Sequence, residues 1–155
     1  MTDVRTIITD WYRVAEEHQD DPFFAFIALW IAFNAHYVST FHDFTDPDAR
    51  VKDHKYVKRF AQDRANVQLH RRLLATSPEY HDAVAKLAER GVTDVISGET
   101  HLIERMEDLL AVAEAVYQVR CNLFHGGKFR DDERDQQLTS ASYTIVNALL
   151  RNVVT

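Results

Sequence analysis

The sequence has little of what disulfide-linked, fibrous or membrane-spanning chains need. Its 155 residues include one cysteine, four glycines and three prolines. A single cysteine excludes a disulfide framework and any zinc site built from cysteines, and so little glycine and proline excludes collagen-like and low-complexity chains. No uninterrupted apolar run reaches the roughly 18 residues of a membrane span, and the start lacks the pattern of a signal peptide. We expect a soluble protein of a reducing cytoplasm that does not bind a membrane.

The composition is that of one globular domain. Apolar residues make up 46% of the chain and charged residues 27%, both ordinary values. A chain of this length buries roughly 70% of its extended surface on folding, which is enough for a core without metal or disulfides. We therefore expect residues 1–155 to form a single domain.

Charge is distributed unevenly along the chain. The net charge is -6, yet residues 50–72 hold eight basic and two acidic residues, a local charge of +6 that leaves -12 elsewhere. We call residues 50–72 the basic window. Such asymmetry is typical of a site for a polyanion on an otherwise acidic protein. The alternative is a solvated helix face.

Apolar periodicity and capping residues predict helices throughout. Asp21-Pro22 reads as a cap and first helical residue, and Ser77-Pro78-Glu79 opens a short helix. Residues 92–99 fit a short extended connector or a turn. The predicted helices cover about 4–19, 23–41, 49–75 in one or two pieces, 77–91, 101–124 and a last helix after a charged loop at 128–135. The predicted fold class is all-α. It is a single bundle of four main helices with a basic helical insertion between the second and third.

Arg120 interrupts the apolar stripe of the predicted helix over 101–124. At 100° per residue it falls on the same face as a set of apolar side chains that lie within about 80° of one another. This set comprises Leu102, Met106, Leu109, Ala113 and Tyr117. A guanidinium keeps its charge, so on such a seam it must be paired or face an anion. The alternative is an arginine that reaches water from a helix end.

The residues after Arg120 supply further polar chemistry. The segment reads RCNLFHGGK from Arg120 to Lys128. His125 offers an acid or base near neutral pH, Asn122 adds an amide, and Lys128 and Arg130 extend the positive charge. Arginine is a forked phosphate ligand. RNA carries its own nucleophile in the 2′-OH, so proton transfer and stabilisation of the phosphorane suffice for cleavage without metal.

With this Arg-x4-His motif at the end of a long helix, the sequence resembles the HEPN superfamily. The stretch WIAFNA from Trp30 to Ala35 and a final amphipathic helix also fit that resemblance. The resemblance implies an all-α bundle and a metal-independent endoribonuclease of a toxin or antiviral-defence system. An endoribonuclease of this type needs no cofactor and no metal. It also implies a homodimer in which Arg and His of both subunits share one cleft, with RNA as substrate and an antitoxin or defence-system protein as a further partner.

The same resemblance implies roles for individual residues. Arg120 would stabilise the transition state and His125 would carry the proton, with Asn122 as a third catalytic residue. The polar residue that often directly follows the family arginine is Cys121 here. Among basic residues, we expect RNA contacts from Lys128, Arg130, Lys55, Lys58 and Arg59. Some HEPN domains are non-catalytic, so a module that binds RNA or a nucleotide, or docks to such a partner, is the alternative.

Several other interpretations stay open. Cys121 and His125 share a helix face and could form a thiol–imidazole pair. His36 and His42 could bind a metal, although no His-x3-His spacing occurs. Asn34 is either a hydrogen-bonded core amide or a site residue. Tyr117 is either packing or a stacking surface for a nucleobase, and Glu114 is taken as a surface residue.

Overall fold

A computed structural model describes residues 3–41, 53–125 and 132–154 of the chain. This part contains seven helices and one hairpin of two short strands. In chain order they are α1 (Val4–Glu17), α2 (Pro22–Phe41), α3 (Asp53–Gln62), α4 (Arg64–Thr76), α5 (Pro78–Arg90), β1 (Val92–Thr93), β2 (Thr100–His101), α6 (Leu109–Phe124) and α7 (Glu133–Val154). The prediction of an all-α bundle is confirmed.

Side-chain caps set several helix ends where the sequence predicts them. The Asp21 carboxylate accepts from the backbone N–H of Phe24 at the start of α2, and Ser77 caps α5 in the same way. Proline follows each cap, at the position where a missing N–H costs nothing. α5 ends at Gly91, whose φ of 70° and close approach to the His101 carbonyl both require glycine.

The basic window forms two helices that belong to the core. The chain breaks at Asp63, which caps α4, so the window folds in two pieces. The first of these two helices, α3, buries four side chains, namely Tyr56, Val57, Phe60 and Ala61. The predicted insertion is therefore not an appendage, because α3 packs against α6 and completes one side of the bundle.

The prediction that a helix begins at 101 is wrong. Thr100 and His101 pair antiparallel with Thr93 and Val92, and α6 begins only at Leu109, after its cap Asp108. Leu102 is 61% exposed, so its helical spacing from Leu109 is coincidental. Strand pairing and a capping carboxylate override the apolar period here.

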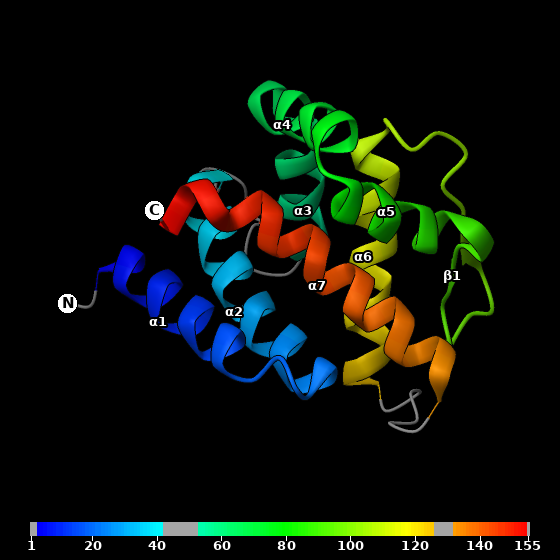
Figure 1. Ribbon diagram of the computed structural model, residues 1–155, viewed down its shortest axis with the longest axis horizontal. Helices are drawn as coiled ribbons and strands as arrows, with labels where there is room; N and C mark the ends of the chain where they lie inside the picture. Colours follow the sequence, from blue (N-terminus) through cyan, green and yellow to red (C-terminus); the bar gives the residue numbers. More distant parts are fainter. Residues whose placement is uncertain (1–2, 42–52, 126–131, 155) are drawn as a thin grey trace.

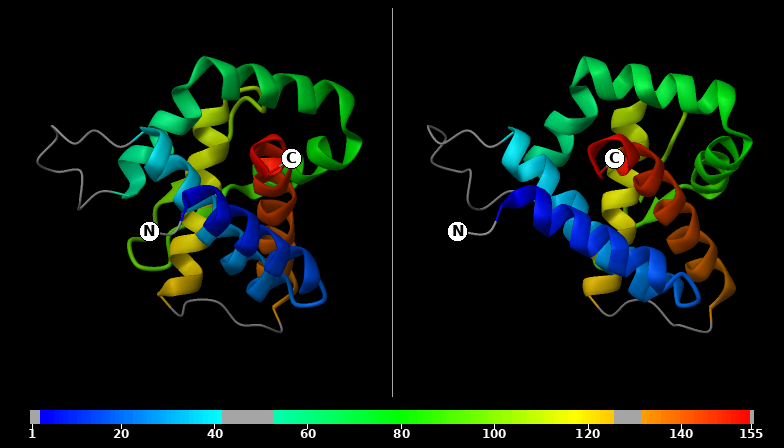
Figure 2. Two further views of the ribbon diagram at one scale, coloured as in Figure 1. Left: turned by 90° about the vertical axis from the view of Figure 1, so that its left-hand side faces the viewer. Right: turned by 60° about the vertical axis from the view of Figure 1, so that its left-hand side comes forward.

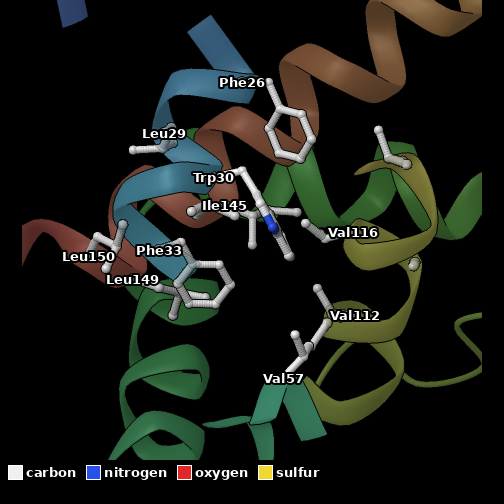
Figure 3. Close-up of a cluster of buried hydrophobic side chains, with 14 of the residues drawn as sticks. Phe26, Leu29, Trp30, Phe33, Val57, Val112, Val116, Ile145, Leu149 and Leu150 are labelled. Atoms are coloured by element: carbon white, nitrogen blue, oxygen red, sulfur yellow. The ribbon is translucent and has the colours of Figure 1, made fainter. Parts of the chain in front are cut away.

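Three helices meet around one hydrophobic core. Figure 1 shows α7 crossing the molecule, with α1 and α2 on one side and α4 and α5 on the other. Figure 1 also shows α6 passing behind α7, and the left view of Figure 2 shows the two helices beside each other. Figure 3 shows Trp30 and Phe33 of α2 facing Val116 of α6 and Ile145 of α7. The buried side chains of these helices form one cluster, to which α1, α3 and α5 contribute as well.

α2 is apolar because it is central. By length and composition it could cross a membrane, a test that the buried core helix of a folded protein also passes. Nine of its residues are buried, and it packs against α1, α3, α6 and α7. A helix that is apolar on most of its circumference is expected at such a position.

Candidate functional site

Arg120 lies on the outer side of α6, one turn before the helix ends. Its guanidinium carbon is 4.6 Å from the centre of the Phe124 ring and 5.7 Å from that of Tyr117. Its Nε is buried and has no hydrogen-bond partner, and Nη1 reaches the Cys121 Sγ at 3.8 Å. Within the described residues no carboxylate forms an ion pair with it. The two rings hold the cation, and its donors are largely unused.

A hydrogen-bonded cluster from α2 and α3 lies near this guanidinium. Tyr37 donates to both carboxylate oxygens of Asp53, at 2.8 and 2.7 Å. The Asn34 amide donates to Asp53 and to the Tyr37 hydroxyl, each at 2.8 Å. Burial raises the pKa of Tyr37 and the Asp53 charge raises it further, whereas the Arg120 charge lowers it. Asp53 therefore brings negative charge into the surroundings of Arg120 without pairing with it.

Tyr117 connects Arg120 to a histidine of α3. The His54 ring stacks on Tyr117, with centres 5.0 Å apart and planes at 26°. Burial, with help from the adjacent Cys121 and Asp53, raises the pKa of Tyr117 to about 12, so its phenol stays neutral. His54 also lies 3.8 Å from Glu114.

His54 is an uncharged ring at neutral pH. Burial lowers its pKa, the Lys58 charge lowers it further, and Glu114 opposes both effects. Lys58 itself lies 3.9 Å from Glu114. Glu114 is thus a bridge between two α3 side chains rather than a plain surface residue.

His125 caps the C-terminus of α6. Its backbone N–H donates to the Cys121 carbonyl at 3.0 Å, and its side chain is exposed. The carboxylate of Asp94, in the hairpin turn, lies close enough to His125 for an electrostatic interaction. A hydrogen bond from the Ile96 N–H is the main cause that lowers the pKa of Asp94, and His125 adds to it.

Asn122 faces the opposite way from the predicted site. It is fully buried, its amide donates to the Thr93 carbonyl at 2.8 Å, and its oxygen accepts from the Val95 N–H at 3.2 Å and from Gln118 at 2.9 Å. Its side chain fastens the β1–β2 turn to α6. The structure therefore groups Arg120 with Tyr117, Cys121 and Phe124, and it separates Asn122 from them.

The predicted RNA-contacting residues fall into three groups. Lys128 and Arg130 lie outside the described residues, as do Arg50 and Lys52 of the basic window. Lys58 is 46% exposed beside the site, and Lys55 is half-buried on the same helix. Arg59 donates to the Phe41 carbonyl at 2.9 Å and lies over the Tyr56 ring, so it joins α3 to the end of α2.

The other interpretations of the sequence have clear structural counterparts. Asn34 is hydrogen-bonded, as the core interpretation requires, but its partners belong to the site. The Cys121 thiol faces Arg120 and Tyr117. His36 is half-buried against Phe60, and His42 lies outside the described residues. In the part of the chain that is described, no three His, Cys, Asp or Glu side chains gather as metal ligands.

Sequence reasoning missed Asp53, His54 and Tyr37. The only early signal was that Asn34 and Tyr37 share a face three residues apart, next to a window rich in charge. The packing of α3 against α2 and α6 decides which residues of the basic window contact Asn34 and Tyr37. No pattern along the chain encodes that placement.

Comparison of the chain with known proteins assigns it to no family. No family model matches the chain, and neither a curated protein nor a solved structure does so. The interpretation of the site therefore depends on its own chemistry.

Proposed function

We propose that this protein is a metal-independent endoribonuclease of HEPN type, acting in the cytoplasm as a toxin or defence effector. One observation carries the proposal: Arg120 is a permanent cation at the rim of the core, with a buried Nε that lacks a partner and no paired carboxylate among the described residues. Leaving such a donor unused costs about 1–3 kcal/mol. A phosphate group would pair the charge of the guanidinium and accept charge-assisted hydrogen bonds from it.

The reaction we assign is internal transesterification. The 2′-OH of RNA attacks the adjacent phosphorus, a P–O bond forms, and the bond to the 5′-oxygen breaks. The products are a 2′,3′-cyclic phosphate and a 5′-OH. His125 takes the proton from the attacking 2′-OH and supplies a proton to the leaving 5′-oxygen. Arg120 stabilises the charged phosphorane. Asn122 acts as a positioning residue that holds the hairpin turn, and Asp94 with it, next to His125.

We further propose that the active unit is a homodimer with a composite site. His125 comes five residues after Arg120, and on a helix this spacing turns it about 140° away. A two-fold axis near the end of α6 would bring the histidine of one subunit to the arginine of the other. Asp53 reduces the repulsion between the two arginines, an effect that α6 alone could not supply. An antitoxin or defence-system protein as a further partner belongs to the same proposal.

The test measures RNA cleavage in the presence of EDTA. We expect the purified protein to cleave single-stranded RNA and the His125→Ala variant to lose a factor of about 10²–10⁴ in rate, as when a positioned acid or base is removed. His81→Ala is the matched control, because His81 is an exposed histidine on α5. Unchanged cleavage by His125→Ala would refute the mechanism, and activity that needs added Mg²⁺ would indicate a different one.

A non-catalytic RNA-binding module is the second candidate. It is favoured by the burial of Asn122, which leaves two of the three predicted catalytic groups. In that case the wild-type protein binds RNA with an affinity that depends on Arg120, and no cleavage products form.

A further inference from the structure

An aromatic column runs from the core to the surface beside Arg120. The Trp30 ring is buried and lies 6.0 Å from the Tyr117 ring, centre to centre. Tyr117 in turn stacks on His54 at 5.0 Å, and the His54 side chain is 40% exposed. The column thus passes through three elements, α2, α6 and α3, and ends in a ring at the surface.

The outer end of this column lies among groups that suit a nucleotide. Arg120 approaches the same Tyr117 ring from its own position on α6. Lys58 is one helical turn after His54 on α3 and is 46% exposed. Proteins hold single strands with bases stacked on aromatic side chains and phosphates on nearby basic ones.

We infer that His54 is a stacking platform for an unpaired nucleobase, placed so that a phosphate of the same strand reaches Arg120. The inference rests on the proposed RNA substrate and adds to it the feature that selects a single strand. His54 takes the role because Tyr117, the residue that the sequence suggested, is covered by the His54 ring. Bases inside a duplex are stacked on one another and do not offer a free face to this ring.

The imidazole is suited to this role for two reasons. Its orientation is fixed by the nearly parallel Tyr117 ring on one side and by Glu114 at its edge, so little side-chain entropy is lost on binding. Its pKa is lowered mainly by burial, so at neutral pH the ring is uncharged and stacks as an aromatic surface. Stacking of this kind tolerates any base, because each base has a π-face.

Binding of single-stranded DNA tests the inference without any cleavage step. The probes are fluorescein-labelled (dA)12 and an abasic 12-mer with the same phosphate charge, titrated with the full chain at pH 7.5 and followed by fluorescence anisotropy. We expect (dA)12 to bind about tenfold more tightly than the abasic strand, as one stacked base permits. His54→Ala should lose that difference, His54→Phe should keep it, and His81→Ala should leave it unchanged.

Two results would overturn the inference. One is equal affinity of the wild-type protein for both probes, which needs no variant and so does not depend on how any variant folds. The other is a His54→Ala protein, folded by circular dichroism, that still prefers (dA)12. Neither result touches RNA cleavage by His125. Conversely, a protein that prefers (dA)12 but never cleaves RNA contradicts only the proposed function.

Discussion

Asn122 and Arg120 are two residues apart on α6, and their surroundings differ completely. Asn122 is fully buried and meets the hairpin backbone through both ends of its amide. Arg120 is half-buried between two rings and has a buried Nε without a partner. The fold thus satisfies the hydrogen-bonding groups of Asn122 and leaves the Nε of Arg120 without a partner. Residue type alone would make both of them site residues, whereas the contacts of Asn122 assign it to the fold and Arg120 stays the candidate for ligand binding.

Two histidines at other helix junctions, His70 and His54, differ in the same way, because one is hydrogen-bonded in the core and the other is not. His70 is fully buried; its Nε2 donates to the Met106 carbonyl at 2.8 Å, and its Nδ1 therefore accepts from the Tyr80 hydroxyl at 2.6 Å. His54 is partly exposed and is held by stacking. The first ring ties α4 and α5 to the loop before α6, and the second presents a face to solvent. Variants of Asn122 and His70, whose polar atoms are hydrogen-bonded, should therefore lower stability more than activity. Variants of Arg120 and His54 should lower the proposed activity more than stability.

The largest effect on stability is expected from Asn122→Ala. Removing the amide leaves the Val95 N–H and the Thr93 carbonyl without their partner, so the free energy of unfolding should fall by about 2 kcal/mol. Chemical denaturation measures this loss, and hydrogen exchange at the Val95 amide should accelerate. Asn152→Ala, at an exposed position of α7, is the control. A fully stable Asn122→Ala protein would show that the turn does not depend on this side chain.

A smaller effect is expected at the His70–Tyr80 hydrogen bond. Tyr80→Phe removes the donor to a buried Nδ1 and should lower the free energy of unfolding by about 1 kcal/mol at pH 7.5. Tyr143→Phe is a matched control, because the Tyr143 hydroxyl has only a long contact, 3.4 Å, with Asn147.

The burial of His70 makes stability depend on pH. Burial lowers the pKa of His70 in the folded protein, while in the unfolded chain it is about 6.5. As pH falls below that value the unfolded state binds the proton first, so the free energy of unfolding decreases. The loss continues down to the folded pKa. His70→Gln should weaken this dependence, and the rest comes from His36 and His54, whose pKa values burial also lowers. A wild-type protein equally stable at pH 5 and pH 7 would contradict this.

The smallest effect on stability is expected from Arg120→Leu. The variant loses two cation–ring contacts, each of roughly 0.5–1 kcal/mol, and gains by no longer burying an unpartnered donor, so its stability should change by less than about 1 kcal/mol. The proposed function predicts that RNA cleavage nevertheless falls steeply, since it makes Arg120 the residue that binds the phosphate. Arg5→Leu, on the exposed side of α1, should change neither quantity. A loss of more than about 2 kcal/mol would show that Arg120 is a structural residue.

Features that depend on neighbouring residues in the chain were predictable. The cap at Asp21, the helix start at Ser77-Pro78 and the position of Arg120 on one face with Tyr117 all follow from local rules. The start of α6 was misplaced because the spacing of Leu102 and Met106 imitates a helical stripe. Asp108 before two leucines was a competing signal for the true start, and it was the correct one.

Features that depend on packing between distant segments were not predictable. Asp53 and His54 meet Tyr37 and Tyr117 across 16 and 63 positions of the chain, and only the position of α3 against α2 and α6 brings them together. Asn122 is expected in the site only because the family resemblance implies a polar residue there and because it lies between Arg120 and His125 in the sequence. Its burial under the hairpin turn could not be seen without the fold.

The position of α6 within the bundle also limits how the site can diverge during evolution. α6 contacts α2, α3, α5, α7 and both strands, so most changes along it disturb the core. α3 reaches the site with partly exposed side chains, and His54 and Lys58 can be exchanged at little cost to the fold. Descendants of this protein should therefore keep the α6 residues and change this surface mainly through substitutions in α3.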